Sequence, residues 1–155
     1  MNVTEAMDSP TPAIAGELLR QARQRAEEGQ RRTLEVLDEM LALPPEQFAH
    51  RLGATLHYPV LALPGFERLK ADFDAIPLTE AMERECLAFR DAEGRLVAVF
   101  GDPFDTRLHA WLEERLHEPF ARVLAHPSDI GAYLSRHEES MHAMGSVLSS
   151  QTGVA

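Results

Sequence analysis

The sequence lacks the short motifs that mark the common catalytic and nucleotide-binding sites. Its 155 residues contain no G-x-x-x-x-G-K-[ST] phosphate loop, no G-x-G-x-x-G turn, no G-x-S-x-G elbow and no C-x-x-C pair. Without a phosphate loop, the chain has no backbone cradle for a triphosphate, so we expect it neither to bind nor to hydrolyse ATP. An enzyme is therefore the weakest of the function classes that we consider.

Cysteine is nearly absent. Cys86 is the one cysteine, which excludes an internal disulfide and suits a reducing compartment. The histidines nearest to it in sequence, His57 and His109, form no recognisable catalytic arrangement with it. We therefore expect Cys86 to be a small buried hydrophobic residue.

Basic residues and long apolar runs are also scarce. Lys and Arg total 15 against 25 for Asp and Glu, a formal net charge of −10, which argues against nucleic acid or an anionic membrane as the main partner. No run approaches the ~20 apolar residues of a membrane span, and residues 1–12 carry acid instead of a signal-peptide pattern. We expect a soluble, cytoplasmic protein without direct insertion into a membrane.

The histidines lack the spacing of a metal site. His137 and His142 are five residues apart, about 140° around a helix, whereas a zincin helix needs two histidines four apart on one face. His109 and His117 can share a helix face, but no third ligand is visible. We expect no metal and no other cofactor.

The clearest pattern in the sequence lies just after the middle of the chain. Leu96–Phe100, a short apolar run with two valines, predicts a buried strand. Asp102 then predicts a helix N-cap, a structural role that we favour over magnesium binding or catalysis, with Pro103 as the first helical residue. Apolar residues follow at helical spacing, which predicts an amphipathic helix with Trp111 in the core.

The first third of the chain predicts a small helical subdomain over residues 13–56, preceded by a disordered lead over residues 1–12. Apolar residues at helical spacing indicate helices over Ala13–Glu28 and Thr33–Leu43 and a third that starts at Pro45 or Glu46. Glycine ends the first helix and proline ends the second.

Residues 57–137 predict a compact domain in which strands pair locally between helices. We expect an edge strand at His57–Leu63, a short helix at Phe66–Phe73, a hairpin joining Cys86–Arg90 to Leu96–Phe100, and a last strand at Phe120–Ala125. The predicted class is α+β, with a three-stranded, largely antiparallel sheet packed by helices. Ser, Gly, Gln and Thr accumulate over residues 138–155, which predicts a linker toward a further C-terminal module.

Several stretches together resemble one family, the MshEN-like N-terminal domains of the GspE/PulE ATPases of type II secretion and type IV pilus assembly. Leu56–Leu63 (LHYPVLAL) is similar to the family's L-G-L-P-Y-V-D-L strand, and Gly94–Asp105 (GRLVAVFGDPFD) to its G-x-L-x-V-A-M-A-D-P-x-D stretch. Ile76–Phe89 and Phe120–Tyr133 resemble the segments around them. The resemblance spans Ala13–Met144 and implies a non-catalytic domain that couples an ATPase module to the cytoplasmic region of an inner-membrane platform protein.

Some of these domains bind cyclic-di-GMP through R-L-G-x-x-L-V-x-x-G units, so the resemblance raises a second function, a ligand sensor. Arg32 falls in place in such a unit, but Leu34 and Leu41 stand where its two glycines would be. A Cβ at those positions blocks close approach of the backbone to a ligand. Arg51–Leu56 is a literal R-L-G-x-x-L, but Val60 replaces the glycine that should follow, and we interpret it as a coincidence.

The helical subdomain also supplies our candidate partner-binding residues. Five arginines between Arg20 and Arg32 form a basic cluster in an acidic chain, which is either a solvated helix face or a site for an anionic partner or ligand. The second helix has apolar residues on more than one side, and surplus apolar surface usually has a partner. The resemblance implies that the platform protein docks here, and the candidate residues are Arg23, Arg32, Val36, Met40 and Leu43.

Overall fold

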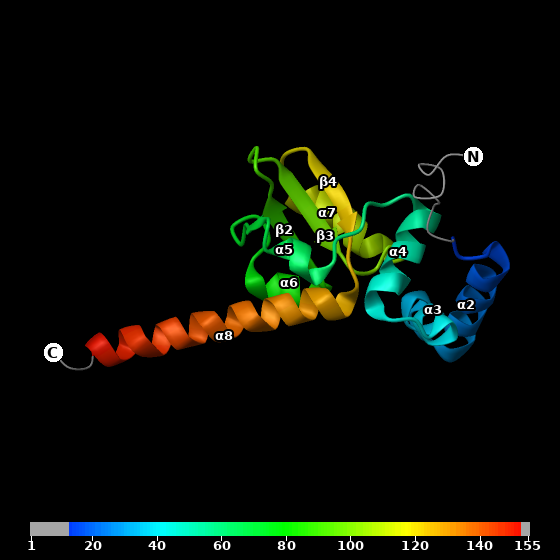
Figure 1. Ribbon diagram of the computed structural model, residues 1–155, viewed down its shortest axis with the longest axis horizontal. Helices are drawn as coiled ribbons and strands as arrows, with labels where there is room; N and C mark the ends of the chain where they lie inside the picture. Colours follow the sequence, from blue (N-terminus) through cyan, green and yellow to red (C-terminus); the bar gives the residue numbers. More distant parts are fainter. Residues whose placement is uncertain (1–12, 153–155) are drawn as a thin grey trace, which may run out of the picture.

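The computed structural model describes residues 13–152, so the lead predicted over residues 1–12 lies outside the described residues. Helices α2 (Gly16–Gly29), α3 (Thr33–Leu41) and α4 (Pro45–Leu56) lie in the segment that we predicted as a helical subdomain, a name that we keep for these three helices. The rest of the chain folds around one sheet. Its elements are α5 (Leu63–Phe66), β1 (Lys70–Ala71), α6 (Leu78–Arg84), β2 (Cys86–Arg90), β3 (Leu96–Phe100), α7 (Thr106–Arg115), β4 (Phe120–Leu124) and α8 (Pro127–Thr152) (Figure 1).

The sheet confirms the α+β class but has four strands instead of three, in the order β1-β2-β3-β4. Strand β1 pairs with β2, and β2 with β3, in antiparallel fashion. The extra strand, Lys70–Ala71, lies inside the stretch where we expected a short helix. Strand β4 pairs parallel to β3, because helix α7 carries the chain back to the starting edge before β4 begins.

The edge strand expected at His57–Leu63 forms only an isolated bridge, between Val60 and Leu124. The Leu61 N–H donates to the Leu124 carbonyl (2.9 Å), and the Leu124 N–H donates to the Pro59 carbonyl (2.8 Å). Pro59 has no N–H to donate, which limits pairing to a sheet edge. This contact fastens the chain leaving α4 to the outer side of β4.

The core lies on both faces of β2 and β3, whose side chains are almost all buried. On one face the rings of Phe66, Phe89 and Tyr133 meet edge to face with centroids 5.4–5.5 Å apart. Cys86 is fully buried, and burial raises the pKa of its thiol to about 12. The prediction that Cys86 is a buried structural residue is confirmed.

Helix α7 begins later than expected, and its cap is Asp105 instead of Asp102. The Asp105 carboxylate accepts from the Leu108 N–H at 3.1 Å. The Asp102 carboxylate accepts from the Phe104 N–H at 3.0 Å and so shapes the loop before the helix. The placement of Trp111 in the core is wrong, since its ring is only half-buried, with the Arg84 guanidinium carbon 4.2 Å from its centroid.

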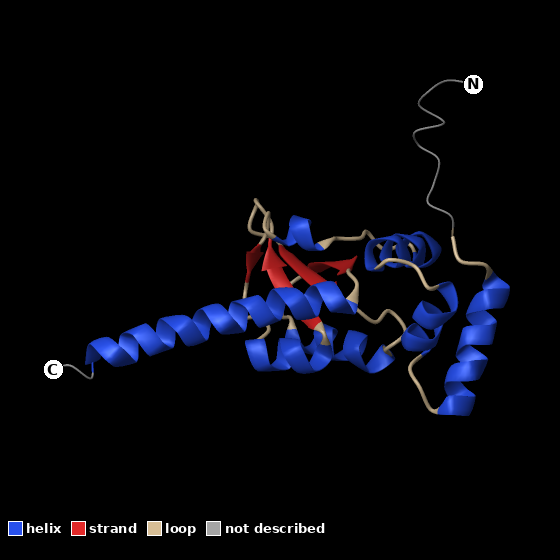
Figure 2. Cartoon of the chain, turned by 60° about the horizontal axis from the view of Figure 1, so that its bottom comes forward, coloured by secondary structure: helices blue, strands red, loops and turns tan. Residues whose placement is uncertain are grey.

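Helix α8 covers most of the segment predicted to be a linker. It runs unbroken from Pro127 to Thr152, so the boundary expected at residue 138 falls inside a helix. Proline is absent after Pro127, which leaves nothing that must break the helix there. In Figures 1 and 2 its outer half extends away from the body, at the end opposite the helical subdomain. No helix of the described residues is both long and apolar enough to cross a membrane.

Candidate functional site

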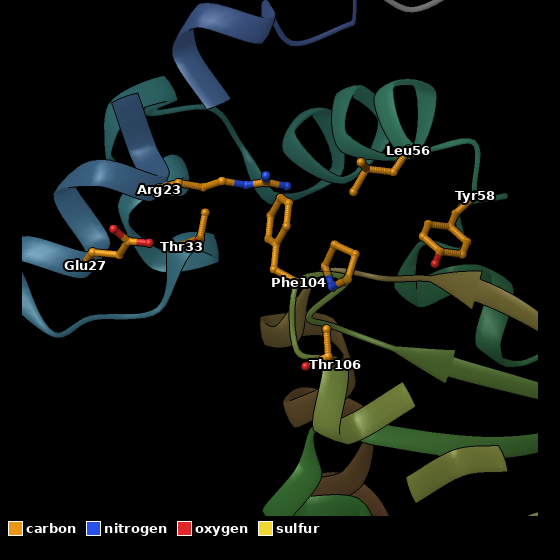
Figure 3. A pocket seen from close by; sticks show the side chains of 8 residues that line it. Arg23, Glu27, Thr33, Leu56, Tyr58, Phe104 and Thr106 are labelled. Atoms are coloured by element: carbon orange, nitrogen blue, oxygen red, sulfur yellow. The ribbon is translucent and has the colours of Figure 1, made fainter. Parts of the chain in front are cut away.

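The candidate site is a cavity of about 420 Å³ between the helical subdomain and the loop that leads from β3 into α7. Three groups of residues line it, from α2 and α3, from the end of α4, and from the loop with the first residue of α7 (Figure 3). They are Arg23, Glu27 and Thr33, then Leu56 and Tyr58, then Pro103, Phe104 and Thr106.

Arg23 is the cation of this cavity. Its guanidinium carbon lies 5.7 Å from the centroid of the Phe104 ring, and Figure 3 shows the guanidinium pointing toward that ring. Such a contact is weakly attractive at an exposed site. Arg23 and Arg25 have no carboxylate within ion-pair distance among the described residues, whereas Arg20 pairs with Glu17 at 2.6 Å. The predicted cluster therefore keeps two uncompensated charges, both on α2.

Arg32 makes contacts within the chain. Its Nη2 lies 3.2 Å from Glu85 Oε2 and its Nε 3.5 Å from Asp102 Oδ2. Asp102 is only 7% exposed, and this burial raises the pKa of its carboxyl group although the Arg32 charge opposes the shift. Arg32 thus joins the start of α3 to the loop at the cavity instead of standing free for a partner.

The apolar candidates divide into two groups. Val36 is 5% exposed and belongs to the hydrophobic core, so a partner cannot reach it in this conformation. Met40 and Leu43 are half-buried and pack against the core from the side of the helical subdomain. The surplus apolar surface therefore comes from Met40 on α3 and from Leu43 just after α3, and not from Val36.

The glycine positions needed for cyclic-di-GMP are filled by packed side chains. Leu34 is 3% exposed, and Leu41 is half-buried against the core. Gly53 of the literal R-L-G-x-x-L has a packing role, since a Cβ there would lie 2.8 Å from the Tyr58 carbonyl oxygen and would clash with the Val60 side chain. This glycine lets α4 lie close to the segment that follows it.

The histidines are spread over the structure. His137 stacks on Phe73 with centroids 4.4 Å apart, while His142 is exposed. His109 packs against Phe100 at 4.7 Å, and burial lowers the pKa of its ring. In the described part of the chain, no group of three His, Cys, Asp or Glu side chains is placed to hold a metal ion.

Sequence reasoning missed the aromatic residues of the cavity. Tyr58 was assigned to an edge strand and Phe104 to a helix face, and they lie 46 positions apart in the sequence. No spacing rule connects such distant residues, because only the tertiary fold, in which Tyr58 packs on Phe100 of β3, brings them to one cavity. The Phe104–Leu108 apolar spacing drew attention to the helix instead.

Comparison with known proteins supports one family. Residues 56–144, more than half of the chain, match the model of the MshEN domain. A structure of MshE with cdg is 24% identical in sequence, with a TM-score of 0.58, covering 79% of this chain and 89% of that chain. The N-terminal domain of XpsE is 20% identical, with a TM-score of 0.53, covering 79% and 85%. No curated protein matches the chain.

Proposed function

Since the chain belongs to the MshEN domain family and has the fold of the XpsE N-terminal domain, it is an N-terminal domain of the GspE/PulE ATPase type, and we propose that its role is docking. The proposed partner is the cytoplasmic region of an inner-membrane platform protein of a secretion or pilus system. The domain itself is non-catalytic, and it attaches an ATPase module to this partner. It is peripheral at the inner membrane through this partner.

The observation that carries this proposal is the uncompensated charge on α2. Arg23 and Arg25 are exposed and lack a carboxylate partner among the described residues, in a chain whose net charge is −10. An isolated basic spot on an acidic protein suits an acidic patch on a partner, because complementary charge guides encounter and orientation. Met40 on α3 and Leu43 just after α3 supply apolar contact area beside these arginines.

The experiment measures association of the full chain with the platform protein's cytoplasmic region. Arg23→Glu combined with Arg25→Glu should slow association about tenfold at low salt, and added salt should bring wild type and variant together. The single changes Arg23→Glu and Arg25→Glu are measured beside the double variant, and Arg20→Glu is their matched control, because it changes the charge equally on the same helix at a residue already paired with Glu17. A double variant that associates as fast as the wild type contradicts this placement.

Arg32 and the apolar residues need separate treatment. Charge reversal at Arg32 also breaks its contacts to Glu85 and Asp102, so any effect on binding mixes docking with a change in the fold. Met40→Asp and Leu43→Asp should instead speed dissociation with little effect on association, since apolar contacts act mainly on the lifetime of a complex. Wild-type dissociation rates in both variants would exclude this part of the surface.

A second candidate function is a cyclic-di-GMP sensor. The observation in its favour is the cavity that holds an arginine beside an aromatic ring, Arg23 and Phe104, together with the fold shared with the structure of MshE with cdg. Leu34 and Leu41 in place of glycines argue against it. A calorimetric titration with cyclic-di-GMP tests it. Saturable heat of binding that disappears in Arg23→Ala and in Phe104→Ala supports the sensor. If the wild type gives no heat of binding, the sensor is excluded and docking is the remaining proposal.

We also expect no catalysis. The sequence holds no phosphate loop, so incubation of the chain with ATP should release phosphate no faster than buffer does. Turnover that a substitution within the chain abolishes would overturn the non-catalytic role.

A further inference from the structure

His126 stands at the point where three helices meet, immediately before α8. Its Nε2 lies 3.3 Å from the Asp38 Oδ2 of α3, and its ring packs edge-on against Phe48 of α4 with centroids 5.7 Å apart. Its Nδ1 lies 3.0 Å from the backbone nitrogen of Ser128 and 2.8 Å from the Ser128 hydroxyl. The side chain is only 11% exposed.

The two contacts fix the state of the ring. The Ser128 backbone N–H can only donate, so Nδ1 must accept and carries no proton. The proton of the neutral imidazole therefore sits on Nε2, where it can donate to the Asp38 carboxylate. A single tautomer satisfies both neighbours, and it does so only while Asp38 holds the opposite side of the ring.

His126 does the work of an N-cap for α8. The first turn of a helix has N–H groups without partners inside the helix, and Pro127 at the first position has none to satisfy. The His126 ring accepts from Ser128, while its carbonyl accepts from Asp129 at 2.9 Å and from Ile130 at 3.2 Å. The start of α8 is thus organised by one residue whose orientation depends on α3.

We propose that His126 couples α3 to α8, so that a change at Asp38 is passed to the first turn of the long helix. The inference rests on the proposed function in one respect. Asp38 lies on α3, one of the helices of the proposed docking surface, and its side chain is 37% exposed, so a partner seated on α3 can reach the acceptor that orients the His126 ring. Loss of that acceptor frees the ring to rotate and leaves the Ser128 N–H without its partner.

The test uses the full chain without any partner and follows backbone amide exchange by NMR. Asp38→Ala should speed exchange of the Ser128 amide about five- to tenfold, the size of an N-cap contribution. The matched control is Glu39→Ala, because Glu39 is the next residue on α3 and bonds Arg31 instead of His126. Exchange at Ser128 should be unchanged in that control.

Two substitutions at His126 separate its two bonds. Asn places an amide oxygen near the position of Nδ1 and keeps the cap, so in His126→Asn the change Asp38→Ala should no longer affect Ser128. Gln places its amide nitrogen near the position of Nε2, so His126→Gln alone should speed exchange at Ser128 while keeping the bond to Asp38.

The coupling is wrong if Asp38→Ala speeds exchange of the Ser128 amide equally in the wild type and in His126→Asn. It is also wrong if Asp38→Ala leaves this exchange unchanged in the wild type. Neither result touches docking, because the exchange measurement contains no partner. Failure of docking appears only in the association experiment with the platform protein, so the two proposals fail separately.

Discussion

In the α+β part the two central strands bury almost every side chain, whereas in the helical subdomain every helix keeps exposed side chains. Helix α2 buries Ala22 and Ala26, small residues that bring it close to α3 but remove little apolar area from water. Strand β3 buries all five of its residues, among them Phe100. The sheet therefore carries most of the apolar burial, and the helical subdomain depends more on its polar contacts to the rest of the chain, such as Arg32 with Asp102 and Asp38 with His126.

The largest expected effect is in the sheet core. Phe89→Ala should lower the free energy of unfolding by about 3–5 kcal/mol, because Phe89 is fully buried between Phe66 and Tyr133 and truncation leaves a cavity. Leu37→Ala is the counterpart in the helical subdomain, with an expected loss of about 2–4 kcal/mol. Denaturant unfolding measures both, and a larger loss in Leu37→Ala would reverse the comparison between the two parts.

Glycine substitutions test the seam between the parts. Gly53→Ala should destabilise by about 1–3 kcal/mol, since its Cβ would meet the Tyr58 carbonyl and the Val60 side chain. Gly131→Ala is the control, because nothing lies within 4 Å of a Cβ there, on an exposed turn of α8. It should stabilise by about 0.5–1 kcal/mol through helix propensity. Thermal unfolding compares the melting temperatures of the two variants. Equal changes in melting temperature would show that α4 is not tightly packed against Tyr58 and Val60.

Trp111→Ala should have an intermediate to small effect, about 1–2 kcal/mol, because the ring is half-buried and shares its face with Arg84. Arg84→Ala isolates the stacking contact and should cost less than the tryptophan change. A loss above about 3 kcal/mol in Trp111→Ala, the size of a core truncation, would place the ring in the core after all.

The smallest expected effect depends on pH. Burial raises the pKa of Asp102, so the folded state holds this proton more tightly than the unfolded chain does. Ionisation therefore costs stability as pH rises through the window between the ordinary and the raised pKa. Asp102→Asn removes this cost and keeps an acceptor for the Phe104 N–H. The variant should gain stability relative to the wild type as the pH rises above the ordinary Asp pKa of about 3.9, as measured by denaturant unfolding, and a stability difference that narrows with rising pH would contradict the assignment.

Much of the architecture follows from local pattern. Leu96–Phe100 was predicted as a strand because a short apolar run with valines between glycines fits a buried strand and little else. The helices predicted over Ala13–Glu28 and Thr33–Leu43 form as α2 and α3, but the left-handed residues Gln30 and Ala42 end them instead of Gly29 and Pro44. The strand Lys70–Ala71 was not predicted, because two residues are too few to show a periodic pattern. They form a strand only by pairing with Phe89 and Arg90.

The candidate site was harder to predict than the fold. Charge alone cannot show which arginine is free, because two of the three carboxylates that pair with Arg32, those of Glu85 and Asp102, lie 53 and 70 positions away. Val36 was predicted to be surplus apolar surface, but in the folded chain it is buried. Arg23 remains as a prediction from sequence that the structure leaves exposed, beside a ring that no spacing rule could have placed there.

Helix α8 also has a mechanical meaning. Its 26 residues span about 39 Å at a rise of 1.5 Å per residue. Its inner half is held by the body, where Ile130 and Leu134 are buried and His137 stacks on Phe73. The helix therefore turns together with the body, and a rotation of about 10° moves its far end by about 7 Å, on the same helix geometry.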